Sequence, residues 1–122
     1  MTESKLTTAL LRELRAALLG AVVLKHNERS LSGVPDFSVT WNGRTSWWEV
    51  KYGSRIISKG IQELTALRLA AAGQCRYIWF QERRGIRLTL ILHPKRLDVP
   101  ESWCVGFDMK WLAEQIRKVH QV

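Results

Sequence analysis

Two carboxylates and an ammonium lie close together in the sequence: Asp36, Glu49 and Lys51. Carboxylate oxygens are the ligands that Mg²⁺ prefers, and this ion commonly takes one or two carboxylates. A bound divalent cation neutralises a phosphate and lowers the pKa of its water from 15.7 toward about 7, and a neighbouring ammonium stabilises charge that develops during the reaction. These residue types therefore favour a site for a hard divalent cation such as Mg²⁺.

A β-hairpin would bring the three side chains together. Asn42-Gly43 is the strongest short-range hairpin signal, because a type I′ turn needs positive φ at both central residues. With these two residues as the loop, Asp36 faces Glu49 on the paired strand, and their Cβ atoms are about 4.5–5.5 Å apart. Lys51 follows two positions later and projects from the same face. A three-residue loop would shift this register and separate the acids.

Two carboxylates that face each other repel, and the hairpin needs something to offset that repulsion. One interpretation is a divalent cation bound between Asp36 and Glu49. The other is a solvated sheet end, where Lys51 forms a cross-strand salt bridge with the acids. By the same alternation Trp47 lies on the face of the acids, whereas Trp48 lies on the opposite face and is expected in the core.

The segment 4–19 is expected to form an amphipathic helix that begins at Ser4 as N-cap and ends at Gly20. Glu13 falls at the edge of the apolar stripe, and a carboxylate turned toward the protein is costly unless it is paired or bound to a metal. Glu13 is therefore either a further acid at the site or one half of an ion pair with an arginine. The stripe itself consists of leucines at i, i+4 spacing: Leu6, Leu10, Leu14 and Leu18.

The remaining segments predict a single α/β domain over residues 1–122, with a core of about 6–97 and a C-terminal helix of about 108–119. The expected element order is α-β-β-β-α-β-β-α, and a helix between the third and fourth strands implies a parallel crossover in a mixed sheet. The expected elements after the hairpin are a helix over Ile61–Ala72 with the apolar stripe Ile61, Leu64, Leu67 and Ala71, strands over Cys75–Phe80 and Ile86–Leu92, and a final helix capped by Asp108.

The charge balance points to a polyanionic partner. The 122 residues include 19 Lys and Arg against 11 Asp and Glu, a formal net charge of +8, which is typical of nucleic-acid-binding proteins. Side chains that flank the acids are candidate DNA contacts: Lys25, His26, Arg29, Ser32, Arg55 and Lys59. His26 is alternatively a structural residue at the end of a strand.

Other classes of protein are disfavoured. No apolar run is long enough to span a membrane, and the N-terminus lacks the apolar core of a signal peptide. Cys75 and Cys104 have no zinc-site spacing, and we interpret them as reduced thiols of a cytoplasmic protein, which is host-cell cytoplasm for a phage-encoded chain.

The PD dipeptide at 35–36 followed by EVK at 49–51 resembles the signature of the PD-(D/E)xK nuclease superfamily. The order α-β-β-β-α-β is that superfamily's core. Together with SGVPD at 32–36 and Gln62 at the start of a helix, the pattern is similar to two groups. One is the virus-type replication-repair nuclease domain and the other is the archaeal-type Holliday junction resolvases. The resemblance covers roughly residues 6–97.

The resemblance implies a restriction-endonuclease-like mixed sheet flanked by helices, here with an extra C-terminal strand and helix. Lys51 would contact the attacking water or the scissile phosphate, and Gln62 would support the site or the substrate. The implied catalytic residues are Glu13, Asp36, Glu49, Lys51 and Gln62, and the implied metal ligands are Asp36, Glu49, Glu13 and the backbone carbonyl of Val50.

The resemblance further implies DNA as substrate, Mg²⁺ or Mn²⁺ as cofactor and no organic cofactor. We favour a structure-selective endonuclease of recombination or repair, of the Holliday junction resolvase kind and of phage type, because the chain has no separate domain to read a major groove. The alternatives are a flap, nick or single-strand nuclease and a non-catalytic basic DNA-binding module. Two symmetric cuts need a homodimer, whose expected interface is the final helix with Trp103 and Trp111, or the strand Ile86–Leu92.

Overall fold

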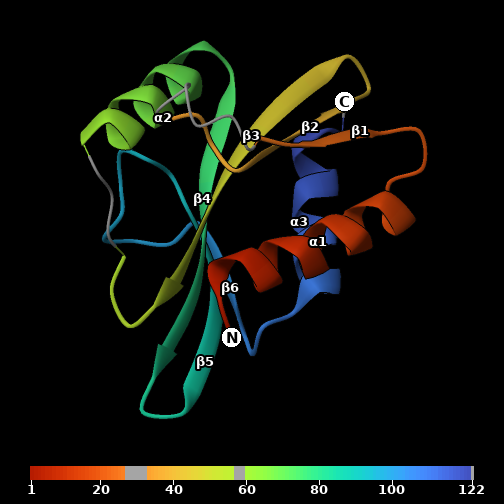
Figure 1. The fold of residues 1–122 in the computed structure, drawn as a ribbon. Helices are drawn as coiled ribbons and strands as arrows, with labels where there is room; N and C mark the ends of the chain where they lie inside the picture. The colour runs from red at the N-terminus through yellow and green to blue at the C-terminus, as the bar shows by residue number, and fades with distance from the viewer. Residues whose placement is uncertain (27–32, 57–59, 122) are drawn as a thin grey trace.

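Six strands form one sheet in sequence order, and helices cover both of its faces (Figure 1). The computed structural model describes residues 1–26, 33–56 and 60–121, with the side chains of 60–62 outside that description. The strands are β1 (Val22–Lys25), β2 (Phe37–Trp41), β3 (Arg44–Gly53), β4 (Gln74–Arg83), β5 (Ile86–Leu92) and β6 (Ser102–Val105), and the helices are α1 (Glu3–Ala17), α2 (Gly60–Ala72) and α3 (Met109–Val119). The expected mixed α/β sheet flanked by helices is confirmed.

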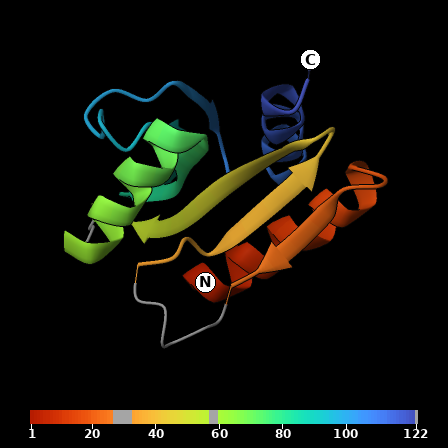
Figure 2. The same cartoon turned by 90° about the horizontal axis from the view of Figure 1, so that it is seen from above.

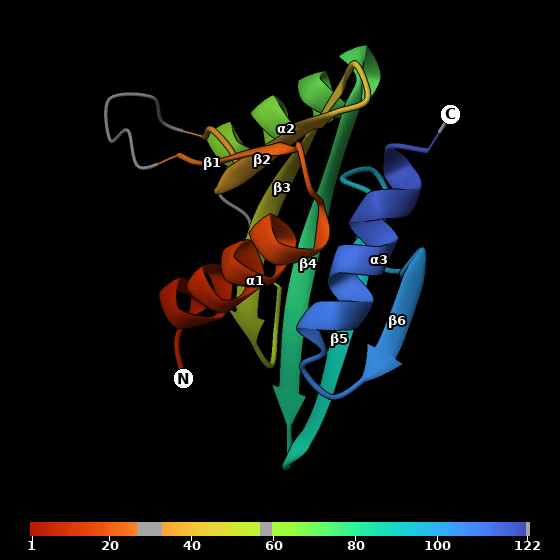
Figure 3. The same cartoon turned by 90° about the vertical axis from the view of Figure 1, so that its right-hand side faces the viewer.

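The helices divide between the two faces of the sheet (Figure 2). α1 and α3 lie beside each other on one face (Figure 3), and α2 lies on the other against β4. We call these the α1/α3 face and the α2 face. All neighbouring strands are antiparallel except β3 and β4, which are parallel and joined through α2. The crossover expected between the third and fourth strands is therefore present.

The hairpin of β2 and β3 has the expected register. Phe37 pairs with Trp48 and Trp41 with Arg44, and the two loop residues Asn42 and Gly43 have φ angles of 52° and 74°. These angles are the left-handed pair that a type I′ turn requires.

A sixth strand is present that the sequence reasoning did not predict. β6 pairs antiparallel with β5 at the edge of the sheet, and alternate residues Trp103 and Val105 are exposed. The alternation of apolar and polar residues over Ser102–Val105 is too short to distinguish a strand from the preceding loop in the sequence. Pairing with β5 supplies the order that the local sequence does not.

Two helices differ in detail from expectation. The N-cap of α1 is Thr2 rather than Ser4, since the Thr2 hydroxyl accepts from the Lys5 backbone N–H at 3.1 Å. In α2 the residue buried against the sheet is Ala66, whereas Leu64 of the expected stripe is 49% exposed. The apolar residues of α2 are spread around the helix instead of gathering on one side, so its sequence does not single out one face.

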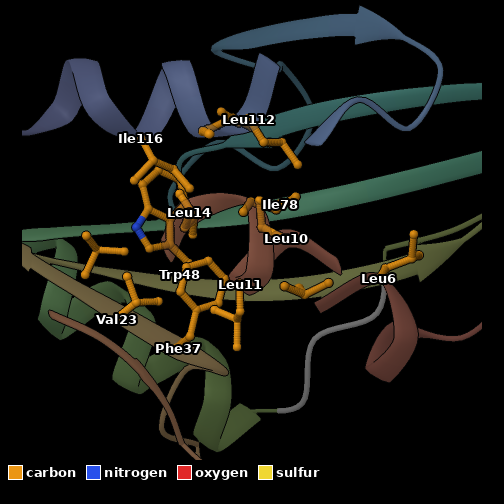
Figure 4. Packing of buried hydrophobic residues seen from close by; sticks show 14 of the residues in the cluster. Leu6, Leu10, Leu11, Leu14, Val23, Phe37, Trp48, Ile78, Leu112 and Ile116 are labelled. Carbon is orange, nitrogen blue, oxygen red and sulfur yellow. The ribbon is translucent and has the colours of Figure 1, made fainter. Parts of the chain in front are cut away.

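The larger core lies between the sheet and the pair α1 and α3. Leucines of α1 interlock there with aromatic residues of the hairpin, including Phe37 and Trp48, and with Leu112 and Ile116 of α3 (Figure 4). Trp48 is 1% exposed, as its position on the hairpin predicted. This packing fixes the hairpin against two helices and so holds the opposite, α2 face of β2 and β3 in place.

Two further expectations bear on the class of protein. Within the described part of the chain, no helix combines the length and apolar character needed to cross a bilayer. Cys75 and Cys104 are both free, the first buried and the second half-buried.

Candidate active site

The strand β3 extends past the N-terminal end of β2, and we call the place where β2 no longer covers the edge of β3 the notch. β2 pairs with β3 only from Phe37 onward, while β3 extends to Gly53 with β4 on its other side. Asp36 is the last residue before β2, and Glu49 is the first residue of β3 beyond the final pair of Phe37 and Trp48. The register therefore places Asp36 and Glu49 opposite each other at the mouth of this notch.

Asp36 is fixed by two backbone contacts. Its side-chain oxygen Oδ2 accepts the backbone N–H of Val50 at 2.7 Å, and its own carbonyl accepts the N–H of His26 at 2.8 Å. The first bond takes the place of the ladder bond that β2 would otherwise give to β3. One carboxylate oxygen of Asp36 is thus used to close the sheet.

Glu49 is almost fully buried and paired with Lys51. Its side chain is 5% exposed, and Oε2 lies 3.1 Å from the Lys51 ammonium nitrogen. This burial contradicts the interpretation of Asp36 and Glu49 as acids at a solvated sheet end, because both members of the Lys51–Glu49 ion pair are largely removed from water. Breaking a buried pair of this kind leaves an uncompensated charge.

The pKa of Glu49 shows the effect of a second carboxylate close by. Burial, the neighbouring charge of Asp36 and a hydrogen bond with the Asp36 carboxyl together raise the pKa of the Glu49 carboxyl to about 7, against the lowering effect of Lys51. One ammonium is therefore insufficient to hold both carboxylates ionised at neutral pH.

The acid of α1 whose charge acts at this notch is Glu3, not Glu13. Partial burial raises the pKa of Glu3, Lys51 lowers it, and the charge of Asp36 raises it. Glu13 is half-buried and is not among the groups that shift Glu3 or Glu49. The two acids are ten residues apart in α1, which is about 15 Å along a helix. Within the described residues Glu13 joins no group of three acids around Asp36 and Glu49, and its role at the site stays a prediction.

Glu3 could have been found in the sequence. It stands three, four and seven residues before Leu6, Thr7 and Leu10, all of which are buried. At about 100° per residue it continues the centre of the buried stripe, whereas Glu13 lies at the stripe's edge. Glu3 therefore lies on the buried side of α1 but before its first buried residue, Leu6, and there it experiences the charges of Asp36 and Lys51.

Asp36 and Glu49 together suit a hard divalent cation that takes few ligands from the protein. Within residues 1–26, 33–56 and 60–121, no three His, Cys, Asp or Glu side chains gather closely enough to hold a metal ion. Mg²⁺ usually keeps several waters and takes only one or two carboxylates, so Asp36 and Glu49 meet that smaller requirement. Their mutual repulsion, which Lys51 alone does not remove, is relieved by such a cation.

The expected DNA contacts divide into four groups. Arg55 is exposed just after β3, beside the notch. His26 is structural, since its ring bonds the Ser38 hydroxyl at 2.9 Å and stacks on Trp47. Lys25 is exposed but, by strand alternation, points to the α1/α3 face. Arg29, Ser32, Lys59 and the side chain of Gln62 lie outside the described residues.

The order of the elements and the mixed sheet define a restriction-endonuclease-like α/β fold. Among solved structures, the chain is similar to that of Archaeoglobus fulgidus Hjc, a Holliday junction resolvase from an archaeal hyperthermophile. The TM-score is 0.58 at 14% sequence identity, and the match covers 90% of this chain and 98% of that chain. No protein-family model and no curated protein sequence matches the chain. At this identity the likeness is one of fold.

Proposed function

We propose that the chain is a metal-dependent DNA endonuclease. The observation that carries the proposal is the pair Asp36 and Glu49, opposed at the notch of the sheet with the Lys51 ammonium 3.1 Å from Glu49. Buried like charges are rare without a functional reason, because they destabilise the fold that contains them. The same spacing of residues is the one that resembles the PD-(D/E)xK signature.

The cation would be Mg²⁺ or Mn²⁺, held by Asp36 and Glu49. When bound, such an ion neutralises the phosphate and lowers the pKa of a coordinated water. The Val50 carbonyl is a further candidate ligand, since N–H and C=O of one residue in an antiparallel strand point toward the same neighbour and the Val50 N–H already meets Asp36.

Lys51 and Glu3 complete the proposed machinery. Lys51 would orient the attacking water or stabilise the charge that builds on the phosphate. Glu3 would add negative potential at the mouth and favour cation binding from a greater distance. Gln62 keeps its proposed supporting role from the sequence resemblance alone.

The substrate would be branched DNA, cut by structure rather than by sequence. This preference for structure over sequence rests on the resemblance of PD at 35–36 and EVK at 49–51 to archaeal-type Holliday junction resolvases. The similar Hjc fold belongs to a Holliday junction resolvase. A flap, nick or single-strand nuclease remains the alternative within the same chemistry.

Symmetric cutting of a junction requires a homodimer. Of the side chains expected at the interface, Trp103 is 57% exposed and Ile86 is 64% exposed, whereas Trp111 is half-buried against the core. Sedimentation equilibrium should give twice the mass of one chain. A monomer at the concentrations that cut junctions would contradict the resolvase form of the proposal.

The decisive experiment compares the unaltered chain with Asp36→Asn on supercoiled plasmid, four-way junctions and flaps, with Mg²⁺ and with EDTA. We expect Mg²⁺-dependent cleavage that falls at least 100-fold in the variant, as for loss of an electrostatic catalytic group. Equal activity of the two proteins, or no cleavage of any DNA, would refute the nuclease and leave a basic DNA-binding module. Symmetric cutting of junctions but not flaps separates the two substrate classes.

A further inference from the structure

A row of side chains crosses the α2 face of the sheet from the candidate active site to the edge. Lys51 of β3 pairs in register with Trp79 of β4, Trp79 with Leu90 of β5, and Leu90 with Trp103 of β6. Residues that pair in register project from the same face, and neighbouring strands are about 4.8 Å apart. Trp79 is therefore the immediate neighbour of Lys51.

An open pocket of about 540 Å³ lies on this row. Its floor consists of Trp79 and aliphatic side chains, among them Leu90 and Leu92 of β5, and its rim carries polar groups. The volume falls within the range of small-molecule sites, which are mostly apolar with a few oriented polar groups. The pocket thus begins one strand away from the proposed catalytic lysine.

The rim presents hydrogen-bond donors that the protein itself does not use. Arg83 donates its Nε to the Ser54 carbonyl at 2.7 Å and lies over the Trp79 ring, with 5.6 Å from the guanidinium carbon to the ring centre. Within the described part of the chain, its two terminal amino groups have no partner. The same holds there for the guanidinium of Arg55 and the amide of Gln81, which also line the pocket.

The charge of the rim is positive. Arg55 and Arg83 stand against one acid, Asp98, whose carboxylate lies 3.4 Å from Arg96. The occupant must therefore combine a flat or apolar body with negative charge. A nucleotide has this combination, since its base stacks on aromatic and guanidinium planes and its phosphate pairs with arginine forks.

We propose that this pocket binds one unstacked nucleotide of the DNA substrate, next to the phosphate that is cut. The base packs over the exposed Arg83 guanidinium, which lies on the buried Trp79 ring, the Gln81 amide meets its polar edge, and Arg55 with the free amino groups of Arg83 holds a flanking phosphate. The proposal rests on the proposed function and names its substrate: DNA in which a base near the cleaved bond is unpaired, as at a branch point or in a single strand.

Binding by the Asp36→Asn protein tests the pocket without cleavage. A branched DNA carries a single abasic site, which is moved one nucleotide at a time along each strand through the branch. We expect one position at which the missing base weakens binding about ten-fold, the size of one stacked base. Other single-stranded positions should change affinity less than two-fold.

The matched variants are Gln81→Ala and Arg83→Ala against Arg12→Ala, which removes the same charge from an exposed site on α1 at the other face. In both pocket variants the position-specific loss should shrink to two-fold or less, and in Arg12→Ala it should persist. A profile with no special position, or one that Gln81→Ala and Arg83→Ala leave unchanged, overturns the proposal.

Two outcomes separate the pocket from the nuclease. If binding is position-specific but the unaltered chain cleaves no DNA, the nuclease proposal is refuted and the pocket proposal stands. If the chain cleaves DNA but binding is not position-specific, the pocket proposal is refuted and the nuclease proposal stands. A deoxynucleoside monophosphate serves as competitor. If it displaces the intact DNA no better than it displaces the abasic DNA, the base is not what the pocket binds, and the proposal fails.

Discussion

Asp36 shows how a single carboxylate serves both fold and site. One of its oxygens accepts the Val50 N–H and so ends the pairing of β2 with β3. The same bond holds the carboxyl group against Glu49, which burial and the proximity of Asp36 make hard to ionise. A residue that only closed the sheet would be better as asparagine or serine, which carry no charge to repel Glu49. The charge at position 36 therefore costs stability, and a function is the reason to keep it.

The raised pKa of Glu49 predicts how metal-free stability depends on pH. Between about pH 4.5 and about 7 the folded chain holds a proton on Glu49 that the unfolded chain has lost. The free energy of unfolding must therefore fall as pH rises through this window, by at most about 3 kcal/mol. Glu49→Gln should remove this fall, which urea unfolding in EDTA at pH 5 and pH 8 would detect. Equal slopes against pH for the two proteins would contradict the prediction.

Glu3 and Glu13 form a natural pair of test positions on one helix. Glu3→Gln should weaken Mn²⁺ binding about three- to ten-fold, because it removes a negative charge that acts on the notch through partly screened space. Glu13→Gln makes the same change ten residues along α1 and should alter binding less than two-fold. Titration calorimetry with Mn²⁺ measures both. A larger effect from Glu13 would support the assignment made from the sequence.

At the scale of elements, the hairpin was predictable because its information is local. Asn42-Gly43 fixes the turn, the turn fixes the register, and the register fixes which side chains share a face. Glu3 is not predicted because the apolar stripe of α1 begins at Leu6, and a charged residue one turn before it does not look like part of that stripe. α2 differs from expectation because its apolar residues are spread around the helix instead of gathering on one side, so packing against β4 decides its orientation.

His120 joins α3 to the hairpin from the other end of the sheet. The ring is fully buried, with Nδ1 3.0 Å from the Trp41 carbonyl and Nε2 2.8 Å from the Ser46 hydroxyl. Because a carbonyl only accepts, Nδ1 carries the proton and Nε2 accepts from Ser46, whose oxygen accepts the Trp48 indole N–H at 2.7 Å. The side-chain polar atoms of His120, Ser46 and Trp48 therefore all have hydrogen-bond partners.

His120→Ala should therefore lower the free energy of unfolding by about 2–4 kcal/mol, since it leaves a cavity and strips buried polar groups of partners. Lys110→Ala is the control on the same helix, at an exposed position, and should stay within about 0.5 kcal/mol of the unaltered chain. Urea unfolding followed by circular dichroism measures both. A loss below about 1 kcal/mol would mean that the polar chain does not fasten α3 to the hairpin.

At the scale of the molecule, the sequence predicted the layers and the parallel crossover but not the edge. The crossover follows from one helix between two buried strands, which has few solutions in space. β6 depends on pairing with β5, and the pocket depends on the loop at 97–100 returning over β4 and β5. Long-range contacts of this kind leave no periodic trace, so only the folded chain reveals them.

The whole-molecule charge makes a last prediction that separates the two partners of the site. With a net charge of +8, the proposed DNA binding would use many phosphate contacts, each of which releases condensed counterions. Affinity for branched DNA should fall by two orders of magnitude or more between about 50 and 200 mM salt. Mn²⁺ binding at Asp36 and Glu49 is confined to the notch and should weaken far less over the same range, because buried charges are poorly screened. Anisotropy titrations with the Asp36→Asn chain and calorimetry with the unaltered chain measure the two slopes. Equal slopes would mean that the cation binds diffusely on the surface and that the opposed acids do not form its site.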